Sequence, residues 1–194
     1  MRLELMSVRE NIAVVEDSVS PETAALAIEF LKRVEGPGWS RTRLSRGGRF
    51  KKNRLGYGRP DQPPVPPILK RLGNEAFENA LKKLPDFPNW NLFSVDTVVV
   101  NRYAPGEGVG YHKDPPRKNA FVVGVTLYDD PSSPHSLMRF LEDEGGAIHD
   151  VPTPHRSSYV FTGPAYHAAK HCRWKTKKQR GTVWSITLRA ARVV

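Results

Sequence analysis

The sequence predicts an α+β fold in which two helices precede a β-rich carboxyl half. Two segments before residue 85 carry apolar residues at helical spacing, and five short runs rich in β-branched and aromatic residues follow it. Helices followed by many short strands are typical of α+β folds, whose strands commonly form a β-sandwich or barrel. The 194 residues suffice for one hydrophobic core, so we expect a single domain over residues 1–194.

The first helix is expected over residues 21–34. Ser20 followed by Pro21 is a typical helix start, because a serine hydroxyl caps the first turn and proline is tolerated at the first helical position. Glycine and proline at residues 36–38 end the pattern. The apolar positions at helical spacing are Ala24, Ile28, Leu31 and Val34.

A second helix is expected over residues 68–84. Residues 60–67 before it contain five prolines and therefore cannot be helical. Beyond them the helical spacing returns at Leu69, Leu72, Phe77, Leu81 and Leu84.

Strands dominate the chain after residue 85. Each expected strand is short and is bounded by Gly, Pro, Asp or Ser. The runs are residues 95–103, 121–128, 137–141, 158–161 and 182–188.

Basic residues outnumber acidic ones and concentrate in two segments. Thirty Lys and Arg against twenty Asp and Glu give a formal charge of +10. Residues 41–59 hold eight basic residues and no acid, which predicts a mobile basic loop or hairpin. Residues 170–180 hold six basic residues and no acid around Trp174, a side chain that could stack on a nucleic-acid base. Both segments favour a phosphate-bearing partner, although a solvated basic surface has the same composition.

The sequence predicts neither a membrane protein nor a secreted protein. No window approaches the ~18 apolar residues of a membrane span. The single cysteine, Cys172, cannot form an internal disulfide or a four-cysteine zinc site. Residues 1–16 mix charged and apolar side chains, unlike the uncharged core of a secretory signal. We expect an intracellular protein, in the cytoplasm or nucleus, with no membrane partner.

His112 and Asp114 form a candidate metal site. They are two residues apart, so on an extended chain both side chains project from one face. A second histidine would complete a two-histidine, one-carboxylate set, which leaves three positions open on iron. His167 and His171 are the candidates for it, because they lie near a possible strand end.

An oxygenase of this type that uses 2-oxoglutarate also needs a cation for the distal carboxylate of that co-substrate. Arginine suits the role because its planar guanidinium binds a carboxylate bidentately. Arg189 follows the apolar run of residues 183–188, so an otherwise buried strand ends in a charge. An ordinary strand-end arginine in solvent would show the same pattern.

Residues 101–114 carry two motifs in close succession, Asn-x-Tyr at residues 101–103 and His-x-Asp at residues 112–114. With this spacing, the segment resembles the AlkB family of iron- and 2-oxoglutarate-dependent dioxygenases. Three further pieces follow the family's order: residues 49–58 resemble a basic segment ending in Tyr-Gly, Val95-Asp96 replaces a frequent Phe-Asn, and residues 186–189 resemble a closing Leu-Thr-Phe-Arg. The resemblance covers roughly residues 40–192.

The resemblance implies a double-stranded β-helix, a jelly-roll-like pair of sheets, with the amino-terminal helices packed outside it. Residues 93–194 would form this catalytic core, and residues 1–92 a helical extension with a basic segment over the substrate. In the family the distal histidine stands eighteen residues before the closing arginine, which selects His171 over His167. The implied iron ligands are His112, Asp114 and His171, and the implied 2-oxoglutarate contacts are Asn101, Tyr103 and Arg189.

The chain departs from the family pattern at three places. The family usually has a second arginine six residues before the closing one, but here that residue is Val183, and Arg180 is the nearest substitute. Pro115 and Pro116 stand where many DNA-repair members carry an acid that helps to read the damaged base. The residues after Tyr57-Gly58 form a short proline-rich run in place of the longer hairpin that covers the nucleotide.

The predicted function is oxidative removal of N-alkyl groups from the bases of DNA or RNA, in DNA repair or RNA modification. Fe(II) is the expected cofactor, 2-oxoglutarate and dioxygen are the co-substrates, and succinate, carbon dioxide and formaldehyde are released. The expected partner is single-stranded nucleic acid, bound by a monomer. Two alternatives stay open. An oxygenase of the same fold acting on a protein or small molecule is favoured by the short lid, and a non-catalytic nucleic-acid binder is favoured by Val183.

Overall fold

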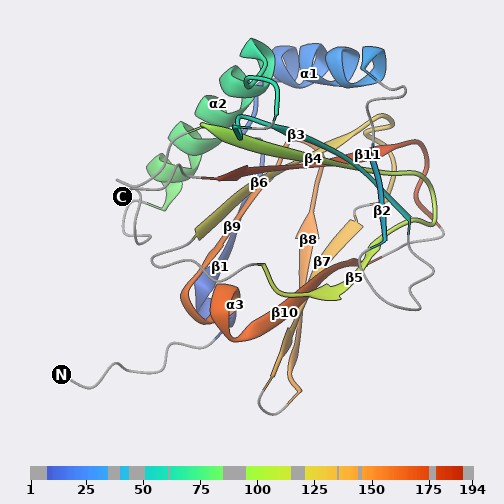
Figure 1. Cartoon of the computed structure of the whole chain (residues 1–194). Coiled ribbons are helices and arrows are strands. Elements are labelled where there is room, and N and C mark those ends of the chain that lie inside the picture. Colours follow the sequence, from blue (N-terminus) through green and yellow to red (C-terminus); the bar gives the residue numbers. More distant parts are fainter. Residues whose placement is uncertain are drawn as a thin grey trace.

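The computed structural model describes residues 8–34, 40–43, 51–60, 62–84, 95–114, 121–134, 136–143, 146–174 and 178–189. Within them, a seven-stranded and a four-stranded antiparallel sheet face each other, and two helices cover the outer face of the larger sheet (Figure 1). This arrangement confirms the α+β class and the expected pair of jelly-roll-like sheets with helices packed outside.

Both predicted helices are present, as α1 (Pro21–Arg33) and α2 (Pro67–Lys83). Helix α2 begins one residue earlier than expected, at Pro67, because proline is tolerated at the first helical position. The Ser20 hydroxyl accepts a hydrogen bond from the backbone N–H of Thr23 at 3.2 Å, as expected of a helix cap. A 3₁₀ turn at Arg9–Asn11 and the short helix α3 (Gly163–His167) were not predicted. None of the helices in the described parts of the chain is both long and apolar enough to cross a bilayer.

The larger sheet has the strand order β1-β9-β6-β11-β4-β3-β2, and the smaller sheet has the order β5-β10-β7-β8. The strands of the larger sheet are β1 (Ile12–Val15), β2 (Ser40–Arg43), β3 (Lys51–Tyr57), β4 (Thr97–Tyr103), β6 (Phe121–Tyr128), β9 (Ser158–Thr162) and β11 (Val183–Arg189). Those of the smaller sheet are β5 (Val109–His112), β7 (Ser136–Glu142), β8 (Ile148–Thr153) and β10 (Ala169–Trp174).

The basic segment of residues 41–59 contains a hairpin. Strands β2 and β3 pair antiparallel, with Arg41 opposite Asn53, which confirms the hairpin interpretation over the loop. Strand β3 pairs in turn with β4, so this amino-terminal segment belongs to the same sheet as the strands after residue 93. Residues 44–50 between the two strands lie outside the described part of the chain.

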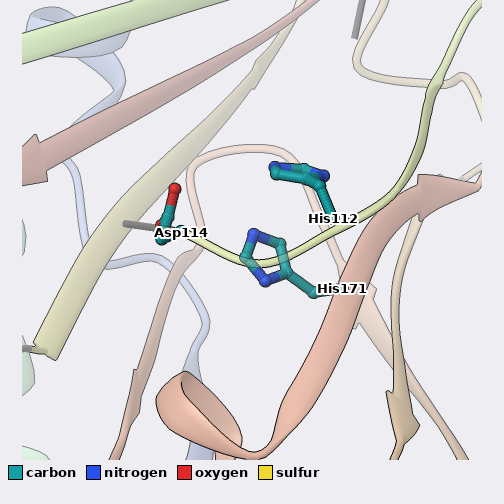
Figure 2. Close-up of side chains that lie close together, drawn as sticks. All are labelled: His112, Asp114 and His171. Atoms are coloured by element: carbon teal, nitrogen blue, oxygen red, sulfur yellow. The ribbon is translucent and has the colours of Figure 1, made fainter. Parts of the chain in front are cut away.

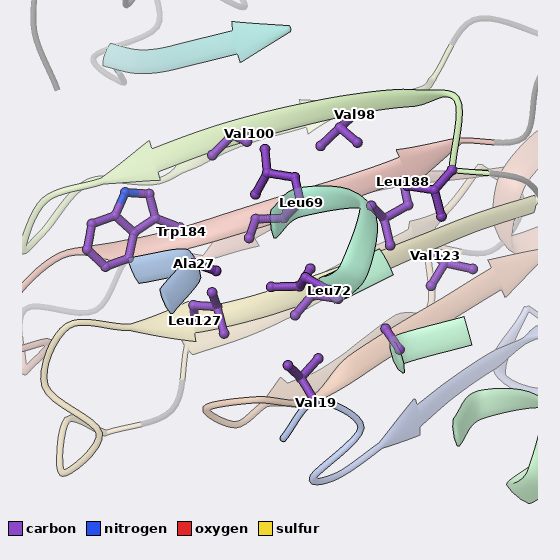
Figure 3. Packing of buried hydrophobic residues seen from close by; sticks show 14 of the residues in the cluster. Val19, Ala27, Leu69, Leu72, Val98, Val100, Val123, Leu127, Trp184 and Leu188 are labelled. Atoms are coloured by element: carbon purple, nitrogen blue, oxygen red, sulfur yellow. The ribbon is translucent and has the colours of Figure 1, made fainter. Parts of the chain in front are cut away.

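Strand β11 shows how the larger sheet separates core from site. Trp184 and Leu188 are fully buried in the cluster formed with the two helices (Figure 3). The alternate residues Ser185 and Thr187 line a cavity on the opposite face, between the two sheets. Alternation along a strand therefore gives the helices an apolar face and the cavity a polar one.

Candidate metal centre and adjoining cavity

His112, Asp114 and His171 lie together where β5 and β10 pair. Their potential ligand atoms all lie within 4.8 Å of one another, and the side chains point toward a common space (Figure 2). His112 ends β5 directly opposite His171 of β10, and Asp114 follows two residues later. The structure thus brings together the three residues that the resemblance implied as iron ligands.

A local irregularity in β5 orients the His112 ring. His171 pairs with His112 but Arg173 pairs with Val109, so β5 contains one residue more than β10 between these pairs, as in a β-bulge. His112 Nδ1 lies 2.9 Å from the carbonyl oxygen of Gly110. Because a carbonyl only accepts, Nδ1 carries the hydrogen, and Nε2 keeps its lone pair for a metal.

The His171 ring is held among aromatic side chains. Its centroid lies 5.1 Å from that of Phe161, 5.8 Å from that of Phe140 and 4.4 Å from that of His112. The residue is only 6% exposed, so packing fixes the ring orientation. His167, by contrast, is the exposed last residue of α3 and is not in this cluster.

A salt bridge ties the metal-binding segment to the neighbouring strand end. Lys113 Nζ pairs with Asp143, which follows β7, and also donates to the backbone oxygen of His167 at 3.2 Å. The hydrogen bond from Lys113 lowers the pKa of the Asp143 carboxyl below its usual value. Lys113 therefore anchors residues 112–114 to the end of β7 and to α3.

A cavity of about 450 Å³ opens beside the three residues, between the two sheets. This volume lies within the range of small-molecule binding sites. His112, Asp114 and His171 contribute to its wall, and the other polar lining residues include Arg54, Asn101, Tyr103, Tyr159, Arg173 and Ser185. The cavity therefore places a polar surface next to the candidate metal ligands.

Asn101 and Tyr103 line this cavity from β4, as a co-substrate contact requires. They are 6% and 2% exposed, respectively. Burial raises the pKa of Tyr103 above its ordinary range, so the phenol stays protonated and can donate a hydrogen bond. Tyr159 lines the same wall of the cavity from β9 of the same sheet, with its hydroxyl 3.0 Å from the Ser185 hydroxyl.

The two arginines expected near 2-oxoglutarate are placed differently. Arg189 is the last residue of β11, as predicted, and its side chain lies outside the described part of the structure. Arg180 is exposed: it donates to the backbone oxygen of Ser132 at 2.8 Å and pairs with Asp130 at 3.7 Å. The structure thus does not bring Arg180 to the cavity, because the turn after β6 holds it elsewhere.

Arg173 lines the cavity although the sequence did not single it out as a site residue. Its signal was present: Arg173 follows His171 by two residues, so in a strand both side chains share a face. Trp174 lies on the opposite face, with the Arg139 guanidinium 4.2 Å from its ring centroid. Trp174 is not among the cavity residues, so stacking on a base at the metal centre is not supported.

Comparisons with known proteins find solved structures that share this architecture. No protein-family model matches the chain, and no curated protein sequence matches it. Among solved structures, the AlkB homologue OsALKBH1 matches with a TM-score of 0.65 and 17% identity, over 92% of this chain and 97% of that one. A prolyl-4-hydroxylase from Pseudomonas putida matches with a TM-score of 0.62 and 16% identity, over 94% of this chain and 93% of that one. The chain therefore has the fold of these two proteins, and its resemblance to AlkB proteins is confirmed at the level of the fold.

Proposed function

We propose that the chain is an Fe(II)- and 2-oxoglutarate-dependent dioxygenase that removes N-alkyl groups from nucleic-acid bases. The observation that carries the proposal is the cluster of His112, Asp114 and His171 at the wall of the cavity. Two imidazoles and one carboxylate are the ligand set of non-haem iron oxygenases, and the donor atoms are close enough to share one ion. The residues present therefore fit Fe(II).

The surrounding residues also fit a 2-oxo dicarboxylate. Asn101 and Tyr103 offer buried hydrogen-bonding groups on the face of β4 that lines the cavity, and Arg189 remains a proposed contact at the end of β11. When bound, Fe(II) and 2-oxoglutarate supply the oxidation of a carbon–hydrogen bond, with release of succinate and carbon dioxide. The protein positions the reactants in the cavity between its two sheets.

Basic residues around the cavity support a nucleic-acid substrate. Arg54, Arg59 and Lys113 contribute to its lining, and Arg54 belongs to the basic hairpin of β2 and β3. The whole chain carries a formal charge of +10. Such a distribution suits a phosphate backbone and supports nucleic acid as the substrate class.

Oxidation of a protein or small molecule is a second candidate, favoured by the segment between β3 and α2. The Gly58 N–H donates to the Pro63 oxygen at 2.8 Å, and the Gln62 N–H donates to the Arg59 oxygen at 2.9 Å. This tight turn takes the place of a longer lid over a nucleotide. The prolyl-4-hydroxylase from Pseudomonas putida, whose fold matches nearly as well as that of OsALKBH1, supports the same candidate.

A substrate panel tests the proposal. N-methylated single-stranded DNA and RNA oligonucleotides and proline-containing peptides are incubated with the protein, Fe(II), 2-oxoglutarate and ascorbate, and products are followed by mass spectrometry. We expect oligonucleotides to lose the mass of one CH2 group with release of formaldehyde, and Asp114→Ala to be inactive. Oligonucleotide affinity should fall with salt, with a slope in log units of roughly 0.7 per phosphate contacted. Oxidised peptides with unchanged oligonucleotides would support the second candidate and refute demethylation.

A further inference from the structure

We propose that Arg173 is the cation that binds the distal carboxylate of 2-oxoglutarate. It would take the role of the arginine that the family usually carries at the position of Val183. The inference rests on the proposed function and names a specificity-determining residue within it. Arg173 lies on β10, in the smaller sheet, whereas residue 183 lies on β11, in the larger sheet. The cation would thus be supplied from the opposite wall of the cavity.

The first argument is that the charge of Arg173 is buried without a balancing acid. The residue is 2% exposed, and one guanidinium nitrogen, Nη2, donates to the Ser136 hydroxyl. The other, Nη1, is buried and has no hydrogen-bond partner, and among the described residues no carboxylate pairs with Arg173. Burying an unpaired charge is costly, so a buried arginine facing a cavity is expected to be completed by an anion there.

The second argument is that neutral groups hold Arg173 in position. Ser136 Oγ, which accepts from Arg173, also lies 3.1 Å from the Tyr128 hydroxyl and 3.4 Å from the Thr153 hydroxyl. This hydroxyl cluster fixes the guanidinium without neutralising it. Arg173 is therefore preorganised for a negatively charged ligand.

The third argument is the position of the guanidinium beside Tyr103. Its central carbon lies 5.3 Å from the centroid of the Tyr103 ring. Val183 pairs with Tyr103 across β4 and β11, so a side chain at residue 183 starts beside the same tyrosine. Arg173 consequently places its charge near the position that the usual arginine would serve, with the protonated Tyr103 phenol as a second donor.

The fourth argument is the distance from the metal ligands. His171 and Arg173 lie two residues apart on one face of β10, so their Cα atoms are separated by roughly 6–7 Å. A five-carbon 2-oxo dicarboxylate has a length suited to this separation. Its 2-oxo acid end would face the metal centre while its distal carboxylate meets Arg173.

Two ligands that differ only in the distal group test the contact between Arg173 and the distal carboxylate. 2-Oxoglutarate and 2-oxopentanoate have the same carbon chain, but 2-oxopentanoate carries a methyl group where the distal carboxylate stands. Both are titrated by calorimetry into the protein loaded with Mn(II) under nitrogen, so that no turnover occurs. We expect Arg173→Met to weaken 2-oxoglutarate binding by about ten- to a hundredfold and to leave 2-oxopentanoate binding unchanged. Arg139→Met is the matched control, because Arg139 pairs with Asp150 outside the cavity.

Two further measurements separate ligand binding from a structural role. If Arg173 is an unbalanced buried charge, Arg173→Met should leave the melting temperature of the ligand-free protein unchanged or raise it. If Arg173 has a structural role, the same substitution should lower the melting temperature. Val183→Arg, added to Arg173→Met, should restore the preference for 2-oxoglutarate over 2-oxopentanoate.

Three results would overturn the inference. If wild type prefers 2-oxoglutarate and Arg173→Met keeps that preference in full, Arg173 is not the cation, while the proposed function stands. If Arg173→Met weakens both ligands equally, its role is structural. If metal-loaded wild type binds neither ligand, the proposed function fails as well.

Discussion

Gly124→Ala is expected to destabilise the protein by displacing Tyr159 from the cavity wall. A Cβ atom at Gly124 would lie 2.0 Å from Cζ, 2.3 Å from the hydroxyl oxygen and 2.5 Å from Cε2 of Tyr159. Carbon atoms in contact are normally about 3.5–4.0 Å apart, so the ring must move by roughly 1.5 Å. Tyr159 is 3% exposed, and its hydroxyl lies 3.0 Å from Ser185 Oγ, so little room exists to move without losing that contact.

The magnitude follows from two costs. Overpacking a core typically costs about 1–3 kcal/mol, and losing a buried hydrogen bond costs roughly 1 kcal/mol. We expect Gly124→Ala to reduce the free energy of unfolding by about 2–4 kcal/mol in urea titrations followed by circular dichroism. In a Tyr159→Leu background, which removes the clashing ring atoms, the same substitution should cost less than about 1 kcal/mol. Equal costs in the two backgrounds would refute the reasoning.

The remaining predictions concern the metal ligands and the buried thiol. Alanine at His112, Asp114 or His171 should weaken Mn(II) binding, measured by calorimetry, by at least about tenfold, because each substitution removes one of three ligands. His167→Ala should bind Mn(II) normally. Normal binding by all four variants would mean that the metal site lies elsewhere. Burial raises the pKa of the Cys172 thiol from its ordinary value of 9.0 to about 11, so native protein should react slowly with a disulfide reagent at pH 8. Because the folded-state pKa is raised, the thiol's contribution to stability is complete below about pH 9 and is lost as the pH rises to about 11, roughly 2–3 kcal/mol in all. Cys172→Ala should therefore lose less stability over that interval in urea titrations, and an identical loss would contradict the raised pKa.

The parts of the fold that the sequence predicted correctly are those set by local patterns. Both helices have apolar residues at helical spacing and a start marked by proline, and those signals need no knowledge of distant residues. The five predicted strands correspond to β4, β6, β7, β9 and β11. The His112 and Asp114 pair was also recognisable, because their spacing and the neighbouring Asn-x-Tyr motif are local.

Two of the strands that the sequence did not predict, β8 and β10, contain polar residues that are typical of turns and surface loops. Strand β8 (Ile148–Thr153) contains His149, Asp150 and Pro152, which are typical of turns, and only its pairing with β7 makes it a strand. Strand β10 contains basic residues at positions 170 and 173, so it resembles a surface loop. Tertiary pairing, which no local pattern encodes, overrides these preferences.

The environment of the two arginines could not be predicted for a related reason. Arg173 is buried by side chains from β4 and β7, which are distant in sequence, so its unbalanced charge is visible only in the fold. Arg180 is only three residues from Val183 in the sequence, but Asp130 and Ser132 of a distant turn bind it outside the cavity.

Conversion of 2-oxoglutarate to succinate by the purified protein tests the central claim most directly. The reaction contains Fe(II), ascorbate, oxygen and an N-methylated single-stranded oligonucleotide, and succinate and formaldehyde are quantified together. We predict that wild type forms succinate and formaldehyde in equal amounts and that His167→Ala does the same. Asp114→Ala should form neither product. Absence of succinate from the iron-loaded wild type with every substrate of the panel, or equal rates in wild type and Asp114→Ala, would contradict the assignment of His112, Asp114 and His171 as a catalytic iron site.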